Sequence, residues 1–170
     1  MIRQYNDPDC AIARSLEVFG DGWSLMVIRQ AFFGARRFAD FERLGISKNI
    51  LTKRLAHLVE QGIFTKSDAG QFGARYEYQL TTKGKDLLTM ITAIRQWGDR
   101  WIFGEGKEPI LVVDRATGEP IRPVRIQREN GEPVPAKDLA LTLGPGASDE
   151  LKTLMKLAEQ RKREKPSKDQ

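Results

Sequence analysis

"RRFADFERLGISKNILTKRL", residues 36–55, contains two helical patterns separated by a short Gly-Ile-Ser break. Three apolar side chains recur at helical spacing before the break: Phe38, Phe41 and Leu44. Gly45 suits the left-handed turn that ends a helix, and Ser47 is a favourable N-cap for the next one. The stretch therefore predicts a short helix, a tight turn and a second helix over residues 47–61.

The second helix of this pair is expected to have one apolar and one polar side. Its apolar residues follow the i, i+4, i+7, i+8 pattern of a buried face: Leu51, Leu55, Leu58 and Val59. At about 100° per residue, polar residues fall on the other side or at the N-terminal end. These are Ser47, Lys48, Asn49, Thr52 and Lys53. Residues 36–57 also hold six Lys/Arg against two Asp/Glu, and this local positive charge favours a polyanion as partner.

The hydrophobic period changes from helical to alternating in the next segment. "IFTKSDAGQFGARYEYQL" (residues 63–80) predicts two short strands joined by a tip, because Tyr76, Tyr78 and Leu80 alternate with polar residues. Two helices around a turn, followed by a hairpin, form the winged helix-turn-helix arrangement, whose second helix enters the major groove of DNA. The fold class expected is therefore mainly α with a small β wing.

Two sets of residues are expected to contact DNA in different ways. The five polar residues of the second helix are expected to read bases, because Asn can pair with adenine and Lys with guanine. Arginines near the helix pair, together with the wing tip over residues 68–75, are expected to contact phosphates or the minor groove. The members of this second set are Arg36, Arg37, Arg54, Gln71 and Arg75.

The rest of the chain predicts further helices over residues 11–19, 22–33 and 83–103. The last of these has an apolar stripe wider than one small core requires, so part of it is expected to face another subunit. Short apolar runs then alternate with Gly and Pro turns, which predicts a β-rich appendage, before Ser148 caps a final helix. The expected parts are a winged helix-turn-helix domain, the appendage, and a helix with a charged tail: residues 1–103, 104–147 and 148–170.

Composition narrows the class of protein. The 170 residues are 30% charged and 40% hydrophobic with a net charge of +5, which is typical of a soluble globular protein. No apolar run reaches the roughly 18 residues of a membrane span and no signal peptide is evident, so a cytoplasmic protein without a membrane partner is expected. A single cysteine excludes a disulfide within the chain and a cysteine-based metal site. No cofactor is expected.

These motifs in combination resemble the HxlR-type bacterial transcriptional regulators. The shared features are a cysteine before a short helix, "GW", "RRF", "GIS" followed by "LTKRL", and "YQLTTKG", all within residues 8–101. The resemblance implies a winged-helix homodimer on a palindromic operator, with the first and last helices of the domain as the dimer interface. The interface residues expected are Ile12, Leu16, Leu87, Ile91, Ile94, Trp97 and Trp101.

The appendage departs from the longer members of that family. In those proteins, cysteine-rich turns at this place resemble a zinc ribbon. Here Thr117, Gln127 and Asn130 stand where the cysteines are expected, so the turns are predicted to persist without a metal.

The chain has one thiol and one imidazole, the side chains of Cys10 and His57. The resemblance implies that Cys10 could act as a redox or electrophile sensor, and the alternative is a half-buried small residue near the dimer interface. His57, the only histidine, is expected to face outward on the second helix as a DNA contact or surface residue. The three tryptophans are assigned to the core and the interface. A small-molecule effector site between the helix over residues 83–103 and the N-terminal helices stays open.

The function expected is that of a DNA-binding transcriptional regulator rather than an enzyme, with repression as its mode. The chain has no phosphate-binding loop, carboxylate pair or catalytic triad. The alternative is a winged-helix protein-interaction module that uses its basic face on an acidic partner. An interaction surface of that kind should carry apolar anchors, and the polar side of the second helix does not.

Overall fold

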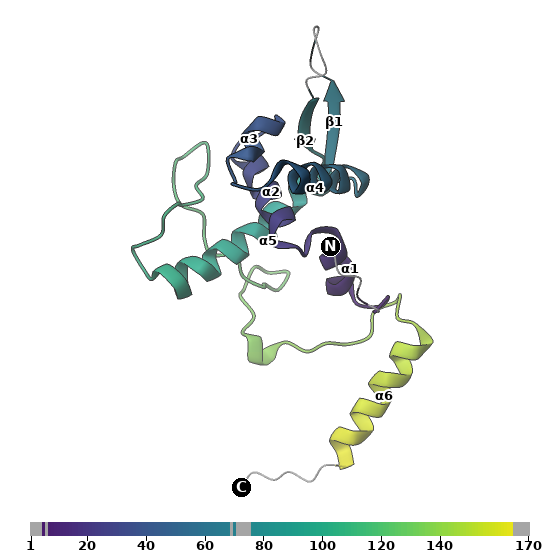
Figure 1. Cartoon of the computed structure of the whole chain (residues 1–170). Helices are drawn as coiled ribbons and strands as arrows, with labels where there is room; N and C mark the ends of the chain where they lie inside the picture. The colour runs from purple at the N-terminus through teal and green to yellow at the C-terminus, as the bar shows by residue number, and fades with distance from the viewer. Residues whose placement is uncertain (1–4, 6, 69, 71–75, 165–170) are drawn as a thin grey trace. The chain divides into compact units, whose positions relative to one another are not determined.

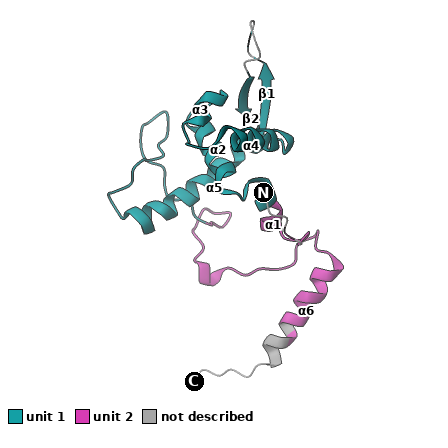
Figure 2. Cartoon of the chain, in the orientation of Figure 1, with its two compact units in different colours: residues 1–4, 15–125 teal, residues 5–14, 126–170 magenta. Residues whose placement is uncertain are grey.

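The computed structural model describes residues 5, 7–68, 70 and 76–164. Figure 2 shows two compact units, of which the first contains residues 15–125 and the second combines residues 5–14 with the chain beyond residue 125. Helix α1 (Ala11–Phe19) contributes residues to both units. Within the described ranges, no helix is long and apolar enough to cross a membrane.

The first unit contains the winged helix-turn-helix. Its elements are α2 (Gly22–Phe32), α3 (Phe38–Glu42), α4 (Lys48–Glu60), β1 (Phe64–Asp68), β2 (Tyr76–Leu80), α5 (Thr82–Gly98) and a π-helical turn, Asp99–Phe103. The two strands pair antiparallel, with Phe64 opposite Leu80 and Asp68 opposite Tyr76, and Figure 1 shows them extending beyond α4 as a hairpin. The expected fold class, mainly α with a small β wing, is confirmed.

Three helices of this unit begin at side-chain N-caps, and the cap predicted for α4, Ser47, is one of them. At each start a side-chain oxygen accepts a hydrogen bond, 3.0–3.4 Å long, from the backbone N–H three residues ahead. The caps are Asp21 for α2, Ser47 for α4 and Thr81 for α5. Gly45 has a φ of +72°, so the turn between α3 and α4 is left-handed as expected.

The core lies where the helices meet the hairpin. Phe41 packs edge-on against Phe64 and Tyr78, with ring centroids 6.2 and 6.3 Å apart, and this joins α3 to both strands. The fully buried aliphatic residues come mainly from α2 and α4: Val27, Ile28, Leu51, Leu55, Leu58 and Ile63. The face of α4 that the pattern predicts as buried is therefore the face that packs inward.

A close backbone contact fixes where α5 begins. Thr81 Oγ1 donates to the carbonyl of Gly62 at 2.7 Å while it accepts from Gly84 N. A Cβ at Gly84 would lie 2.3 Å from the carbonyl oxygen of Ile63, so only glycine allows this approach. The start of α5 is thereby held against the chain that leaves α4.

The segment after the π-helical turn is less regular than expected. Residues 104–147 contain no strand, and their antiparallel pairing is limited to two isolated bridges: Val113–Pro120 and Gln127–Pro133. One residue of each bridge is a proline, which has no N–H and therefore cannot donate the hydrogen bond that would continue the pairing. The expected β-rich appendage is therefore a pair of turns, with Gly118 at φ +74° and Gly131 at φ +83°.

The second unit ends in the long helix α6 (Asp149–Glu164), preceded by a 3-10 turn, Ala136–Asp138. Ser148 Oγ accepts from Leu151 N at 3.1 Å, which confirms the cap expected for this helix. The same hydroxyl donates to the carboxylate of Asp9, so this unit joins the start of the chain to α6.

Candidate nucleic-acid interface

The outer side of α4 is polar and open to solvent. Lys48, Asn49, Thr52 and Lys53 are all exposed, as is Ser47 at the helix start. Thr52 Oγ1 donates to the carbonyl of Lys48 at 2.8 Å, and Lys48 Nζ lies 3.2 Å from Glu42 Oε1 although its side chain is 80% exposed. Within the described part of the chain, the side chains of Asn49 and Lys53 have no polar partner. Their hydrogen-bonding groups are therefore available to another molecule.

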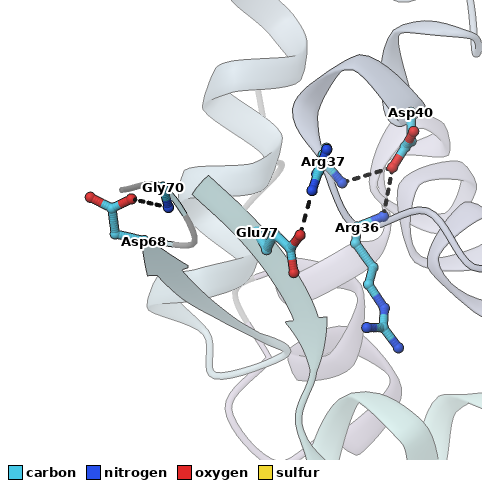
Figure 3. A network of polar contacts seen from close by, with 6 residues as sticks. All are labelled: Arg36, Arg37, Asp40, Asp68, Gly70 and Glu77. Atoms are coloured by element: carbon cyan, nitrogen blue, oxygen red, sulfur yellow. Dashed lines mark hydrogen bonds and ion pairs between the residues drawn. The ribbon is translucent and has the colours of Figure 1, made fainter. Parts of the chain in front are cut away.

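A network of polar contacts joins the start of α3 to the wing (Figure 3). The backbone N–H groups of Arg36 and Arg37 both donate to Asp40 Oδ2, at 3.0 and 2.9 Å. These two hydrogen bonds, which favour the ionised carboxylate, hold the pKa of Asp40 below its ordinary value. Arg37 Nε lies 3.2 Å from Glu77 Oε1 on β2, and Tyr78 N donates to Arg36 O at 2.7 Å. The "RRF" motif therefore anchors the wing to the helix pair.

The two arginines of this network differ in the pairing of their side chains. The side chain of Arg37 is 60% exposed, and its guanidinium is paired with Glu77. The side chain of Arg36 is exposed, and Figure 3 shows it directed away from Asp40. Arg36 is thus the more available of the two for a phosphate group.

Arg54 lies differently from the sequence-based expectation. Its side chain is only 14% exposed, and Nε lies 3.0 Å from Asp21 Oδ1 at the start of α2. A guanidinium held in this way fixes the position of α4 within the unit, and it is not presented to a DNA backbone.

The outward orientation expected for His57 is wrong. The ring is half-buried, and Nε2 lies 3.0 Å from the carbonyl oxygen of Val18 in the last turn of α1, to which it donates. Helical phase alone did not indicate this contact, because the partner lies 39 residues earlier in the chain. Two side chains, Arg54 and His57, therefore attach α4 to the junction between α1 and α2.

The wing contributes a cation on β1. Lys66 Nζ lies 3.6 Å from the ring centroid of Tyr76 on the paired strand, a cation–π contact. Gln71 and Arg75, which the sequence predicts as DNA contacts at the tip, lie outside the described residues.

Known proteins share this arrangement. The family model of the HxlR-like helix-turn-helix matches residues 18–105, more than half of the chain. The chain belongs to the HxlR-like helix-turn-helix family. An uncharacterised HTH-type transcriptional regulator of Mycobacterium tuberculosis is 37% identical to this HxlR-like chain over 137 residues, 80% of this chain and 87% of the relative. Another from Synechocystis is 31% identical over 112 residues, 65% of this chain and 80% of the relative.

Solved structures give the same fold. PA1607, a candidate transcription factor, has a TM-score of 0.73 and 38% identity, over 80% of this chain and 96% of that one. PA1374 of Pseudomonas aeruginosa has a TM-score of 0.61 and 37% identity, over 85% and 99% of the two chains. A MarR-family regulator of Porphyromonas gingivalis has a TM-score of 0.51 and 28% identity, over 59% and 100%. The HxlR-like chain thus falls among DNA-binding transcriptional regulators.

The residues predicted as a dimer interface, which come from α1 and from the apolar stripe over residues 83–103, form a set that is partly exposed in this HxlR-like chain. Four of its residues are more than half exposed: Ile12, Ile94, Trp97 and Trp101. Three are half-buried: Leu16, Leu87 and Ile91. The stripe continues into the π-helical turn, where Ile102 is 69% and Phe103 50% exposed. Sequence reasoning left these two residues out, although the apolar run "WIF" was the signal for them.

Cys10 precedes α1 in the second unit. Its thiol is half-buried, and Sγ accepts a weak hydrogen bond from Ala13 N at 3.4 Å. No group of three potential metal ligands is present among the residues that the structure describes. The sensor role of Cys10 stays a prediction.

Proposed function

We propose that this HxlR-like chain regulates transcription as a homodimer that binds a palindromic operator, with repression as its mode. One observation carries the proposal: α4 buries Leu51, Leu55 and Leu58 while Asn49 and Lys53 stay exposed and unpaired within the described chain. Amide and ammonium groups on an exposed helix are suited to base edges in the major groove. We expect the protein in the cytoplasm.

The proposed contacts follow from this orientation of α4. In a homodimer the two copies of α4 would enter successive major grooves about 34 Å apart. Ser47, Lys48 and Thr52 join the base-reading face, and Arg36 with Arg37 contacts phosphates. Gln71 and Arg75 complete the set at the wing tip, whereas Arg54 has a positioning role.

Fluorescence anisotropy with the intergenic DNA upstream of the gene tests this function. We expect saturable binding whose affinity falls steeply between 50 and 200 mM salt, roughly tenfold or more for a few phosphate contacts. A scrambled fragment of equal length should bind more weakly. Failure to bind any fragment of the host genome at low salt would contradict the proposal and favour an acidic protein as partner.

Substitutions separate the two kinds of DNA contact. Lys53→Ala should relax base preference, lowering operator affinity roughly tenfold or more while leaving binding to the scrambled fragment nearly unchanged. Arg75→Ala should weaken both by a similar factor. Lys137→Ala, a lysine of the 3-10 turn, is the matched control. If all three proteins bound both fragments as wild type does, these assignments would be wrong.

A further inference from the structure

We propose that a cavity between α2 and α5 binds a small hydrophobic anion, an aromatic or branched aliphatic carboxylate. The cavity has a volume of about 570 Å³ and lies wholly within the first unit. This is the size range in which proteins hold small organic ligands. Its walls are mainly apolar: Leu25, Met26, Ile91, Ile94, Phe103 and Ile110. Ile91 and Ile94 also belong to the predicted dimer interface, so the site would border that interface.

Two guanidinium groups converge on this apolar cavity. Arg29 of α2 and Arg95 of α5 both line it, and the Cζ atom of each lies 5.5 Å from the ring centroid of Phe33. The ring of Phe33 therefore makes cation–π contacts with arginines from two different helices. Asp99 also lines the cavity, so its charged groups leave an excess of one positive charge. A ligand with a single negative charge would balance it.

Most donors of these arginines are unused. Arg29 Nη2 donates to Gln30 Oε1 at 3.2 Å. Arg95 Nη1 makes one long hydrogen bond, 3.4 Å, to the carbonyl of Ile110. Because each guanidinium has five N–H groups, several donors stay available, and a carboxylate here could be bound by two charge-assisted hydrogen bonds.

The segment after the winged helix-turn-helix domain supplies one wall of the cavity. Phe103, Pro109 and Ile110 line it, and the hydrogen bond from Arg95 holds Ile110 in place. Gln96 of α5 also accepts from Val124 N at 2.7 Å, which fastens the following turn to the same helix. The extension therefore completes a ligand site that α2 and α5 alone would leave open.

The cavity is connected to the DNA-binding face through α2. Asp21 caps α2 and pairs with Arg54 of α4, while Gly22, the next residue, lines the cavity. A ligand that shifts α2 would change the orientation of α4, and thereby the affinity for DNA. This regulatory effect rests on the proposed function, whereas binding of the ligand does not.

Isothermal titration calorimetry tests the site, with naphthalene-2-carboxylate as the probe and the neutral naphthalene-2-carboxamide as its isostere. The carboxylate should bind the full-length protein with one site per chain and roughly tenfold or more tighter than the amide. Equal affinities, or no saturable binding of the carboxylate, would overturn the proposal. The carboxylate would also fail to bind if the partner chain of a dimer filled the cavity, and that result would overturn the proposal as well.

Variants locate the probe. Arg29→Met and Arg95→Met should each lower affinity for the carboxylate roughly tenfold and leave the amide unchanged. Arg115→Met, in a turn outside the cavity, should bind both as wild type does. Thermal unfolding checks that each variant is folded. The comparison of the carboxylate with the carboxamide uses wild-type protein, so it tests the site even if a variant fails to fold. Loss of carboxylate affinity in Arg115→Met, or its retention in both other variants, would refute the site.

Anisotropy with the operator fragment tests the regulatory effect separately. Saturating naphthalene-2-carboxylate should change operator affinity at least threefold in wild type and not in Arg29→Met. Binding by calorimetry without a change in DNA affinity would refute the coupling alone. A protein that binds the carboxylate but no DNA would refute the proposed function and leave the ligand site standing.

Discussion

The carboxylate of Asp21 makes three contacts at the start of α2, one of which is a hydrogen bond that Oδ2 accepts from the buried Ser24 hydroxyl at 2.5 Å. It accepts from Ser24 N at 3.0 Å as the N-cap of the helix, and it forms a 3.0 Å ion pair with Arg54 of α4. The two paired side chains are only 14–15% exposed, so water screens their attraction weakly. One residue thus sets both the beginning of α2 and the position of α4, the helix that we propose to face DNA.

Substitutions at Asp21 should separate these two contributions. Asp21→Asn keeps an N-cap but removes the ion pair, and should lower the free energy of unfolding by about 2 kcal/mol because Arg54 is left half-buried without its partner. Asp21→Ala should lose about 1 kcal/mol more, since the cap is lost as well. Urea unfolding measures both. In a double-mutant cycle with Arg54→Met, a coupling energy near zero would contradict the assignment.

Ionisation of Asp40 should make the free energy of unfolding depend on pH. Its folded-state pKa is lowered by the two backbone hydrogen bonds from Arg36 and Arg37. Stability from this source is therefore fully present above the unfolded-state pKa of about 4 and is lost as the pH falls through the lower folded-state value. Urea unfolding from pH 5 to 2 should show a steeper loss below about pH 4 in wild type than in Asp40→Asn. Equal slopes in the two proteins would show that these bonds do not stabilise the ionised form.

At the scale of the element, α5 contains two glycines in different surroundings. A Cβ at Gly84 would meet the carbonyl oxygen of Ile63 at 2.3 Å, whereas one at Gly98 would meet only Ile102 Cδ1 at 3.9 Å. The first is a collision with backbone and the second an ordinary contact.

The same substitution should therefore have opposite effects at the two positions. Gly84→Ala should lower the free energy of unfolding by about 1–3 kcal/mol, because neither backbone can move without displacing a helix. Gly98→Ala should raise it by up to about 1 kcal/mol through helix propensity. Chemical denaturation of the two variants under identical conditions is the measurement. Destabilisation of equal size in both would show that the close approach at Gly84 does not matter.

The elements themselves could be predicted from the sequence because their signals are local. Ser47 and Thr81 cap helices through a residue three positions ahead, and Gly45 determines its own turn. The roles of Arg54 and His57 could not, because helical phase gives a direction and not a partner, and both partners lie more than 30 residues earlier. A small-molecule site near α5 was left open from the sequence, but the residues that line the cavity beside Phe33 could not be named, since three separate segments form it.

At the scale of the whole molecule, the proposed homodimer depends on the apolar stripe of α5 and of the π-helical turn that follows it. Trp97 is 60% and Trp101 66% exposed in the single chain. Burying two such rings against a second copy would remove a large apolar area from water, which is the main driving force for association.

Replacing one ring should break that association. Wild type should sediment at twice the 19.3 kDa mass of one chain, and Trp101→Glu should shift towards the monomer by at least tenfold in dissociation constant, because a carboxylate would be buried at the interface. Leu141→Glu is the matched control, since Leu141 is 96% exposed and outside the stripe. A monomeric wild type in analytical ultracentrifugation would rule out the proposed homodimer.

The two contacts that fasten α4, His57 to Val18 and Arg54 to Asp21, are made by other residues than the exposed Asn49 and Lys53. Different residues therefore determine which bases α4 would prefer and the angle at which α4 would enter the major groove. Exchanging outward residues could give the protein a new target sequence without tilting the helix. Changes confined to residues 18–21 could alter the tilt, and with it the half-site separation tolerated, while the preferred bases stayed the same.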